Sequence, residues 1–209
     1  MKAFLLQPFV LAKIKSVCES YLATLTAPTS GAWKVSYLDY EPDKLSITSS
    51  LFDGAIACYA KTVTFPDGSG SSTGIQSSVN TLVVDCYGFG DPIKTTNEDL
   101  SYSFGDSVRE AQKRAQILAT ITYRAIMDRR ENQGATGVPK WYNSNLAITD
   151  RYPLTISKGS PIGNLETKRG ICVYRCEFKF NFDEAVPSEP LGSDYSGASS
   201  ISSATTDPA

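Results

Sequence analysis

Residues 106–130, DSVREAQKRAQILATITYRAIMDRR, decide the fold, because start signal, periodicity and stop signal all indicate one long helix. Ser107 followed by Glu110 is typical of a capping box, in which each side chain binds a free backbone amide at the start of a helix. Arg129 and Arg130 place positive charge at the carboxyl end, where it interacts favourably with the helix dipole. The sequence therefore predicts a central helix over about 106–130.

This central helix has one apolar face. Its first half carries the small residues Ala111, Ala115 and Ala119, which allow a sheet or another backbone to approach closely. The cations of the opposite side favour a solvated face over a nucleic-acid surface. The apolar stripe consists of Val108, Ala111, Ala115, Leu118, Thr122, Ala125 and Ile126, and the expected polar face carries Arg109, Lys113, Arg114 and Arg124.

Composition excludes several classes of function. The chain has 209 residues, a formal net charge of -2 and an isoelectric point near 5.3, so no overall positive field attracts nucleic acid or an anionic membrane. It contains no histidine, which removes the usual base of hydrolase triads and the commonest zinc ligand. We therefore expect no enzyme activity, no cofactor and no metal centre.

The remaining chemical motifs favour structural roles. The five cysteines form no CxxC pair and lie in apolar runs, which indicates buried free thiols rather than disulfides. Asp85, the sole acid of an apolar strand, is interpreted as structural rather than catalytic. The GSGSSTG stretch at 68–74 lacks the lysine of a phosphate-binding loop. The acids of the connecting loop are expected to be solvated rather than to bind a metal, and they are Asp91, Glu98, Asp99 and Asp106.

Periodicity along the rest of the chain predicts an α+β fold. A first helix is expected over about 9–26, a long hairpin over about 55–89, and an alternating strand over 171–182. Together they predict one domain, residues 1–186, in which a mixed or antiparallel sheet packs against two helices. Residues 187–209 are rich in Ser, Gly and Pro, and are expected to be flexible or ordered by a neighbour. The N-terminal apolar run is interrupted by charge and proline, so it predicts neither a signal peptide nor a membrane span.

Two segments are candidate contact sites. Trp141 and Tyr142 lie side by side in a turn-rich loop, where they either pin the loop to the body or contact a partner. The hairpin tip is too polar to pack by itself, so it is either mobile or ordered by a neighbour. Its candidate contact residues are Asp67, Gly68, Ser69 and Gly70.

The order of elements resembles that of the tail terminator and tail-completion proteins of long-tailed bacteriophages, and of related head-completion neck proteins. The resemblance covers about residues 9–186. It depends on the helix RAQILATITYRAIMD at 114–128 and on the ending CEFKFNFDEAVPSE at 176–189.

The resemblance implies a structural virion protein that assembles in the host cytoplasm. It implies a six-subunit ring that stops polymerisation of the tail tube and joins the tail to the head. The implied partners are other copies, the tail tube protein and a head-completion or adaptor protein, with DNA passing through the lumen without specific binding. Lys168, Arg169 and Arg124 are the candidate lumen cations. The alternatives are an adaptor on the portal side and a nucleic-acid-binding module that uses the cationic face of the central helix.

Overall fold

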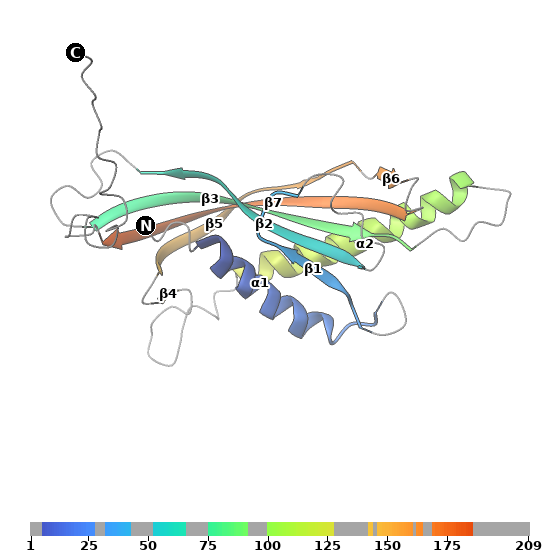
Figure 1. The fold of residues 1–209 in the computed structure, drawn as a ribbon, viewed down its shortest axis with the longest axis horizontal. Helices are drawn as coiled ribbons and strands as arrows, with labels where there is room; N and C mark the ends of the chain where they lie inside the picture. Colours follow the sequence, from blue (N-terminus) through green and yellow to red (C-terminus); the bar gives the residue numbers. More distant parts are fainter. Residues whose placement is uncertain are drawn as a thin grey trace, which may run out of the picture.

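A computed structural model shows a layer of two helices against one face of a seven-stranded sheet (Figure 1), which confirms the α+β prediction. It describes residues 6–27, 32–42, 52–65, 75–91, 100–127, 142–143, 146–160, 162–164 and 169–185. The helices are α1 (Leu6–Leu22) and α2 (Leu100–Met127). The strands are β1 (Val35–Leu38), β2 (Gly54–Thr64), β3 (Ile75–Phe89), β4 (Tyr142–Asn143), β5 (Leu146–Lys158), β6 (Ile162–Asn164) and β7 (Arg169–Ala185).

The sheet is mixed, with the strand order β1-β2-β3-β7-β5-β4 and with β6 paired to β7. Its only parallel pair among the described strands is β1 with β2. The predicted hairpin is confirmed, because β2 and β3 pair antiparallel from Gly54 opposite Gly88 to Thr64 opposite Val79. The long final strand, β7, lies between β3 and β5 and pairs antiparallel with both.

Helix α1 packs on the core through one stripe of residues at four-residue steps. It begins and ends earlier than the predicted 9–26, because the apolar spacing already starts at Leu6 and the chain turns after Leu22. The stripe meets α2 and the inner face of the sheet in one hydrophobic core, to which Ile56, Val84 and Phe178 also belong. The buried stripe of α1 is Leu6, Val10, Ile14, Cys18 and Leu22.

Helix α2 begins at Leu100, so the predicted capping box at Ser107 is wrong. Ser107 lies inside the helix and is buried. Its hydroxyl donates to the carbonyl oxygen of Asp91 at 2.7 Å and accepts from the amide of Gly170 at 2.8 Å. The hydroxyl of Ser107 thus forms hydrogen bonds with backbone groups of two other segments and does not cap the helix, which continues through this position.

Small residues bring the first half of α2 into backbone contact with the sheet, as the alanine spacing predicts. A Cβ atom on Gly88 would lie 2.1 Å from the carbonyl oxygen of Ala111, and one on Gly90 would lie 1.9 Å from that of Ser107. On β7, a Cβ on Gly170 would lie 2.5 Å from Cα of Val108. Glycine is required at these positions because any side chain would separate helix and sheet.

Two further predictions are confirmed. Along β7, Cys176, Phe178 and Phe180 are buried, while the alternate positions, among them Arg175, are at least partly exposed. All five cysteines are buried free thiols.

In the described part of the chain, no helix is both long and apolar enough to cross a membrane.

Candidate subunit interface

One edge of the sheet is open along β5. Over Asp150–Lys158, this strand pairs with β7 on one side and has no strand partner on the other among the described residues, since β4 reaches only Ala147 and Leu146. Two register irregularities interrupt the pairing, one of them next to Pro153, and an edge position suits proline because it has no amide to donate to a neighbouring strand. Such features are common at edges, where unpaired backbone groups are free to pair with another chain.

Large apolar side chains lie exposed beside this open edge. Ile156 is 53% exposed and Leu154 is 44% exposed. Ile156 is opposite Cys176 in the register and so lies on the helix-covered face, at the margin that α2 leaves uncovered. Nearby, the half-exposed ring of Tyr123 lies 6.5 Å from the ring of Phe178. An open edge combined with exposed apolar side chains is typical of a contact surface.

The opposite edge of the sheet has a different construction. Strand β1 covers only the first part of β2, from Gly54 to Ala57. Beyond it, the side chain of Gln7 accepts a hydrogen bond from the amide of Ala60 at 3.2 Å and donates one to the carbonyl oxygen of Asp39. One side chain thus occupies two backbone groups at this edge. The two edges of the sheet are therefore chemically unlike.

A groove of about 430 Å³ runs between α1 and α2 on the helix side. Arg124, predicted as a lumen cation, is exposed and lines this groove. The groove has apolar surface from Ile117 and Ile121 of α2 and from Leu25 after α1. Lys113 also lines it, about three helical turns before Arg124 on α2. The groove therefore combines apolar walls with two cations.

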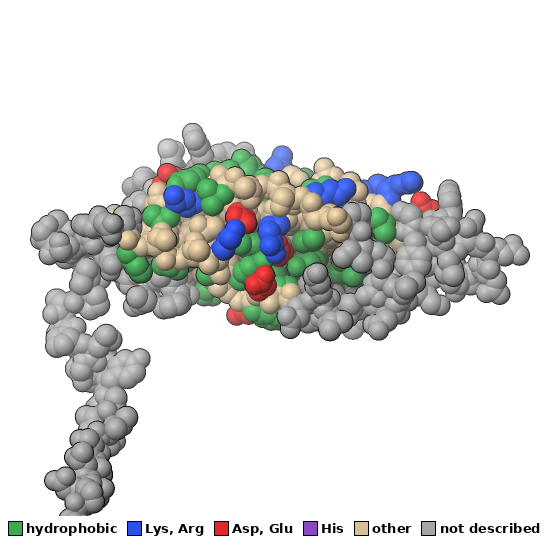
Figure 2. All heavy atoms as spheres, turned by 90° about the horizontal axis from the view of Figure 1, so that it is seen from above, with side chains coloured by type: hydrophobic (Ala, Val, Ile, Leu, Met, Phe, Trp, Pro, Cys, Tyr) green, Lys and Arg blue, Asp and Glu red, His purple; other side chains and the backbone are tan. Residues whose placement is uncertain are grey.

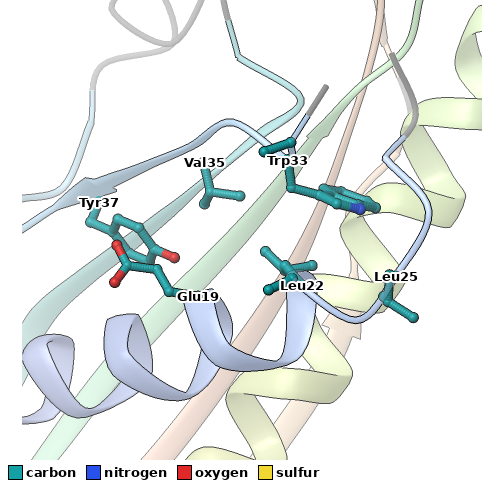
Figure 3. Close-up of a pocket in the computed structure, with 8 residues that line it drawn as sticks. Glu19, Leu22, Leu25, Trp33, Val35 and Tyr37 are labelled. Atoms are coloured by element: carbon teal, nitrogen blue, oxygen red, sulfur yellow. The ribbon is translucent and has the colours of Figure 1, made fainter. Parts of the chain in front are cut away.

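A second hollow, of about 390 Å³, lies between the end of α1 and β1 (Figure 3). Figure 3 shows Leu22 facing Trp33 and Val35, Leu25 on the chain that leaves α1, and Glu19 beside the ring of Tyr37. The indole nitrogen of Trp33 donates to the carbonyl oxygen of Thr26 at 3.3 Å. Trp33 is thereby held against the chain that leaves α1, and the hollow continues the core rather than presenting a cluster of reactive groups.

On the sheet face away from the helices, Asp85 is fully buried within a polar cluster. Arg175 donates to both carboxylate oxygens, at 2.8 and 2.7 Å, and the hydroxyl of Tyr59 donates at 2.9 Å. The hydroxyl of Tyr87 lies 3.4 Å from the same carboxylate. Charged side chains gather in the middle of the face that Figure 2 shows. These contacts give Asp85 the structural role expected from the sequence.

Electrostatics within this cluster follow from burial and from the carboxylate. Burial, followed by the charge of Asp85, raises the pKa of Tyr59 and of Tyr87 above the ordinary value of 10.0. Hydrogen bonds to Asp85 raise the pKa of Arg175. The cluster therefore keeps neutral phenols and a charged guanidinium, an arrangement that links β2, β3 and β7.

A second cluster lies where α2 meets the sheet, and it corrects two predictions. Arg114 is 2% exposed, not on a solvated face, and it donates to Asp91 at 2.6 Å and to the carbonyl oxygen of Phe89 at 2.6 Å. Asp53 lies 3.5 Å away. Asp91 is consequently an ion-pair partner and not only a solvated loop charge.

Arg169 is also in this region, with 5% of its surface exposed. Its guanidinium donates to the carbonyl oxygen of Gly90 at 2.5 Å and lies 6.0 Å from the ring of Phe89. Burial, followed by the positive charge of Arg114, lowers its pKa. The prediction that Arg169 lines a lumen is therefore wrong, because the side chain is enclosed by the fold.

These contacts reduce the number of cations that the exposed face of α2 could offer to a nucleic acid. Arg114 is withdrawn from the cationic face of α2. On the same helix, Arg109 pairs with Asp106 at 3.4 Å and Lys113 pairs with Glu110 at 2.9 Å. Exposed pairs of this kind reduce the positive field that a phosphate backbone requires.

Groups of three or more acidic or cysteine side chains suited to a metal ion are absent from the described residues.

Most residues predicted as contacts lie outside the described residues, namely Trp141, Asp67, Gly68, Ser69, Gly70 and Lys168. The backbone of Tyr142 is in β4, paired with Ala147. Sequence patterns did not identify the β5 edge as a contact site or reveal the α1/α2 groove. An available signal was the run LTIS at 154–157, in which apolar and polar residues alternate after a proline.

No protein-family model matches this chain, and no curated protein is significantly similar to it.

Proposed function

We propose that this chain is a structural virion protein that forms a ring at the head-proximal end of a phage tail, where it terminates tube polymerisation and joins the tail to the head. The observation that supports this most is the pair of unlike sheet edges. The β5 edge is open and flanked by exposed Ile156 and Leu154, while the β1 edge is short and occupied in part by Gln7. A contact between two unlike surfaces runs head to tail, and it forms a ring when the rotation from copy to copy closes.

The charged interior supports a structural rather than a catalytic role. Arg175 pairs with buried Asp85, and buried Arg114 pairs with Asp53 and Asp91, so these ion pairs join strands and helix to one another. Removing one partner would leave a buried charge uncompensated, which opposes separation of the elements that the pairs join. A ring subunit under mechanical load from tail and head benefits from elements that are tied together in this way.

The proposed ring passes DNA without holding it. Arg124 is the one candidate lumen cation whose side chain the structure describes as exposed. With a net charge of -2, the chain lacks the dense positive surface that produces tight, salt-dependent DNA binding. In this proposal, copies of the chain, the tail tube protein and a head-completion protein are the binding partners.

Electron microscopy of particles assembled without this chain tests the proposal. The expected result is overlong tails without heads beside heads filled with DNA, since nothing stops growth of the tube. Adding back the purified chain to such tails should restore joining. Tails of normal length detached from heads would instead favour the adaptor position on the portal side, and normal infectious particles would contradict both positions.

A further inference from the structure

The groove between α1 and α2 has charge at two points and apolar surface between them. Lys113 and Arg124 are eleven residues apart on α2, so they are separated by roughly 16 Å along the helix axis. Between them lie Ile117 and Ile121, with Tyr21 and Leu25 on the opposite wall. Tyr21 is 41% exposed. This spacing suits an extended segment with two anions and an apolar residue between them.

Both cations are available to such a segment. Within the part of the chain that the structure describes, Arg124 has no ion-pair partner. Lys113 pairs with Glu110, but both side chains are well exposed. Exposed pairs contribute about 0–1 kcal/mol, so Lys113 can exchange its partner at little cost.

The chain itself contains a segment with the matching pattern. Residues 187–209, which lie outside the described residues, include Glu189, Asp194 and Asp207 but no lysine or arginine. In an extended chain, Glu189 and Asp194 are separated by roughly 17 Å, close to the spacing of the two cations on α2. Leu191 lies between them. One carboxylate can therefore meet each cation while Leu191 contacts the apolar wall.

Chain length favours a neighbouring copy for this pairing. Strand β7 and helix α2 run in the same direction, since Gly170 lies against Val108 and Phe178 against Tyr123. Ala185 is thus roughly 23 Å beyond the level of Tyr123, and Figure 1 shows β7 ending away from the end of α1. From Ala185 to Glu189 the chain spans at most about 14 Å. The backbone of Glu189 therefore stays roughly 9 Å short of the level of Arg124 in its own copy, a gap that both side chains would have to cross fully extended, so we assign the contacts to another copy.

We propose that residues 189–194 of one copy bind in the α1/α2 groove of a neighbouring copy, with Glu189 and Asp194 against Lys113 and Arg124. In the proposed ring, which this inference presupposes for its neighbour, the contact is a strap between adjacent subunits, and Arg124 then binds the strap and does not face the lumen. It adds to the sheet-edge contact and uses a separate surface, so the two can be removed one at a time.

Photo-crosslinking of the full chain tests the strap. A benzoylphenylalanine at Thr120 lies in the groove, and a control at Ser16 is on the exposed side of α1, away from the residues that line the groove. Unlabelled and ¹⁵N-labelled copies are mixed, irradiated and mapped by mass spectrometry. We expect mixed-label crosslinks from position 120 to peptides within 187–209, and at least about fivefold fewer from position 16. Same-copy crosslinks only, or none to this segment from position 120, would overturn the proposal.

Charge exchange gives a second, independent readout. Lys113→Glu with Arg124→Glu should lower the yield of the mixed-label crosslink at least about fivefold, and adding Glu189→Lys with Asp194→Lys should restore it. Both groove residues are exposed, so circular dichroism should remain unchanged. An undiminished crosslink, or no restoration, would contradict the pairing. The result is separable from the proposed function: ring-forming chains without the crosslink refute the strap alone, and crosslinked chains without tail defects refute the tail role alone.

Discussion

At the scale of single residues, the fold depends on charges placed where water is excluded. Arg114 is held by Asp91 and by the carbonyl oxygen of Phe89 at short distances, with Asp53 close by. A buried ion pair of this kind adds little stability compared with an apolar replacement of both partners. Loss of one partner, however, leaves the other charge buried without compensation. The contribution of Arg114 therefore appears mainly when it alone is removed.

Replacing Arg114 by methionine should lower the free energy of unfolding by about 3–5 kcal/mol, because Asp53 stays buried without its cation. Urea denaturation monitored by circular dichroism measures this. Arg109→Met is the matched control: its side chain is exposed, its pair with Asp106 is on the surface, and the expected change is below about 1 kcal/mol. Equal losses in both variants would show that the cluster around Arg114 contributes no more than a surface ion pair.

The phenol of Tyr59 makes stability fall at high pH. Burial, with the charge of Asp85, raises its pKa above 10.0 in the folded chain. As pH rises above about 10, the unfolded chain loses a phenolic proton that the folded chain retains, so unfolding becomes more favourable. Tyr59→Phe should therefore lose less stability than the wild type between about pH 9 and pH 11, by urea denaturation. Tyr21→Phe, which changes an exposed phenol, should behave like the wild type.

Residue-level predictions succeeded where the chemistry was local. Asp85 was interpreted as structural because it is the sole acid of an apolar strand, and the structure surrounds it with hydrogen-bond donors from Arg175 and Tyr59. Arg114 was placed on the polar face with the other cations of the helix, although it lies three residues after Ala111 and four before Leu118 of the apolar stripe. Its buried partner Asp53 is 61 residues away, and helical periodicity contains no information about such a distant carboxylate.

At the scale of elements, one seam fixes α2 against the sheet. The glycines of β3 and β7 face alanine and serine of the helix with no room for a further carbon atom. The alanine spacing predicted a close approach, but not which glycines meet it, since this requires the register of β3 with β7. The same missing information caused the error at Ser107, whose hydroxyl serves the seam and not the helix start.

Gly88→Ala should destabilise the chain by at least about 3 kcal/mol, because the new methyl group would lie 2.1 Å from the carbonyl oxygen of Ala111 and 2.4 Å from the amide nitrogen of Ala115. Thermal unfolding by calorimetry measures the loss. Gly159→Ala is the control, since its methyl group meets a side-chain carbon of Val173 and that side chain can shift. A loss at Gly88 no larger than that at Gly159 would mean that α2 moves freely relative to the sheet.

At the scale of the whole molecule, the sheet has two unlike edges, and the proposed ring uses the open one along β5. Alternation predicted the hairpin of β2 and β3 and the long strand β7, but the order of strands in the sheet depends on contacts distant in sequence, such as the parallel pairing of β1 with β2. In the sequence, only Pro153 indicates which strand lies at an edge of the sheet. The exposure of Ile156 follows from the limited reach of α2 across the sheet, which no local pattern encodes.

Ile156→Asp should weaken self-association of the chain at least about tenfold, because a carboxylate that enters a dry contact loses hydration without gaining a partner. Since Ile156 is 53% exposed in the single copy, the variant should fold with an unchanged circular dichroism spectrum. Sedimentation velocity over a concentration series measures the association. Ser20→Asp adds the same charge to the exposed side of α1 and should leave association unchanged. If Ile156→Asp assembles as the wild type does, the β5 edge is not the contact between copies, and the ring must close through another surface.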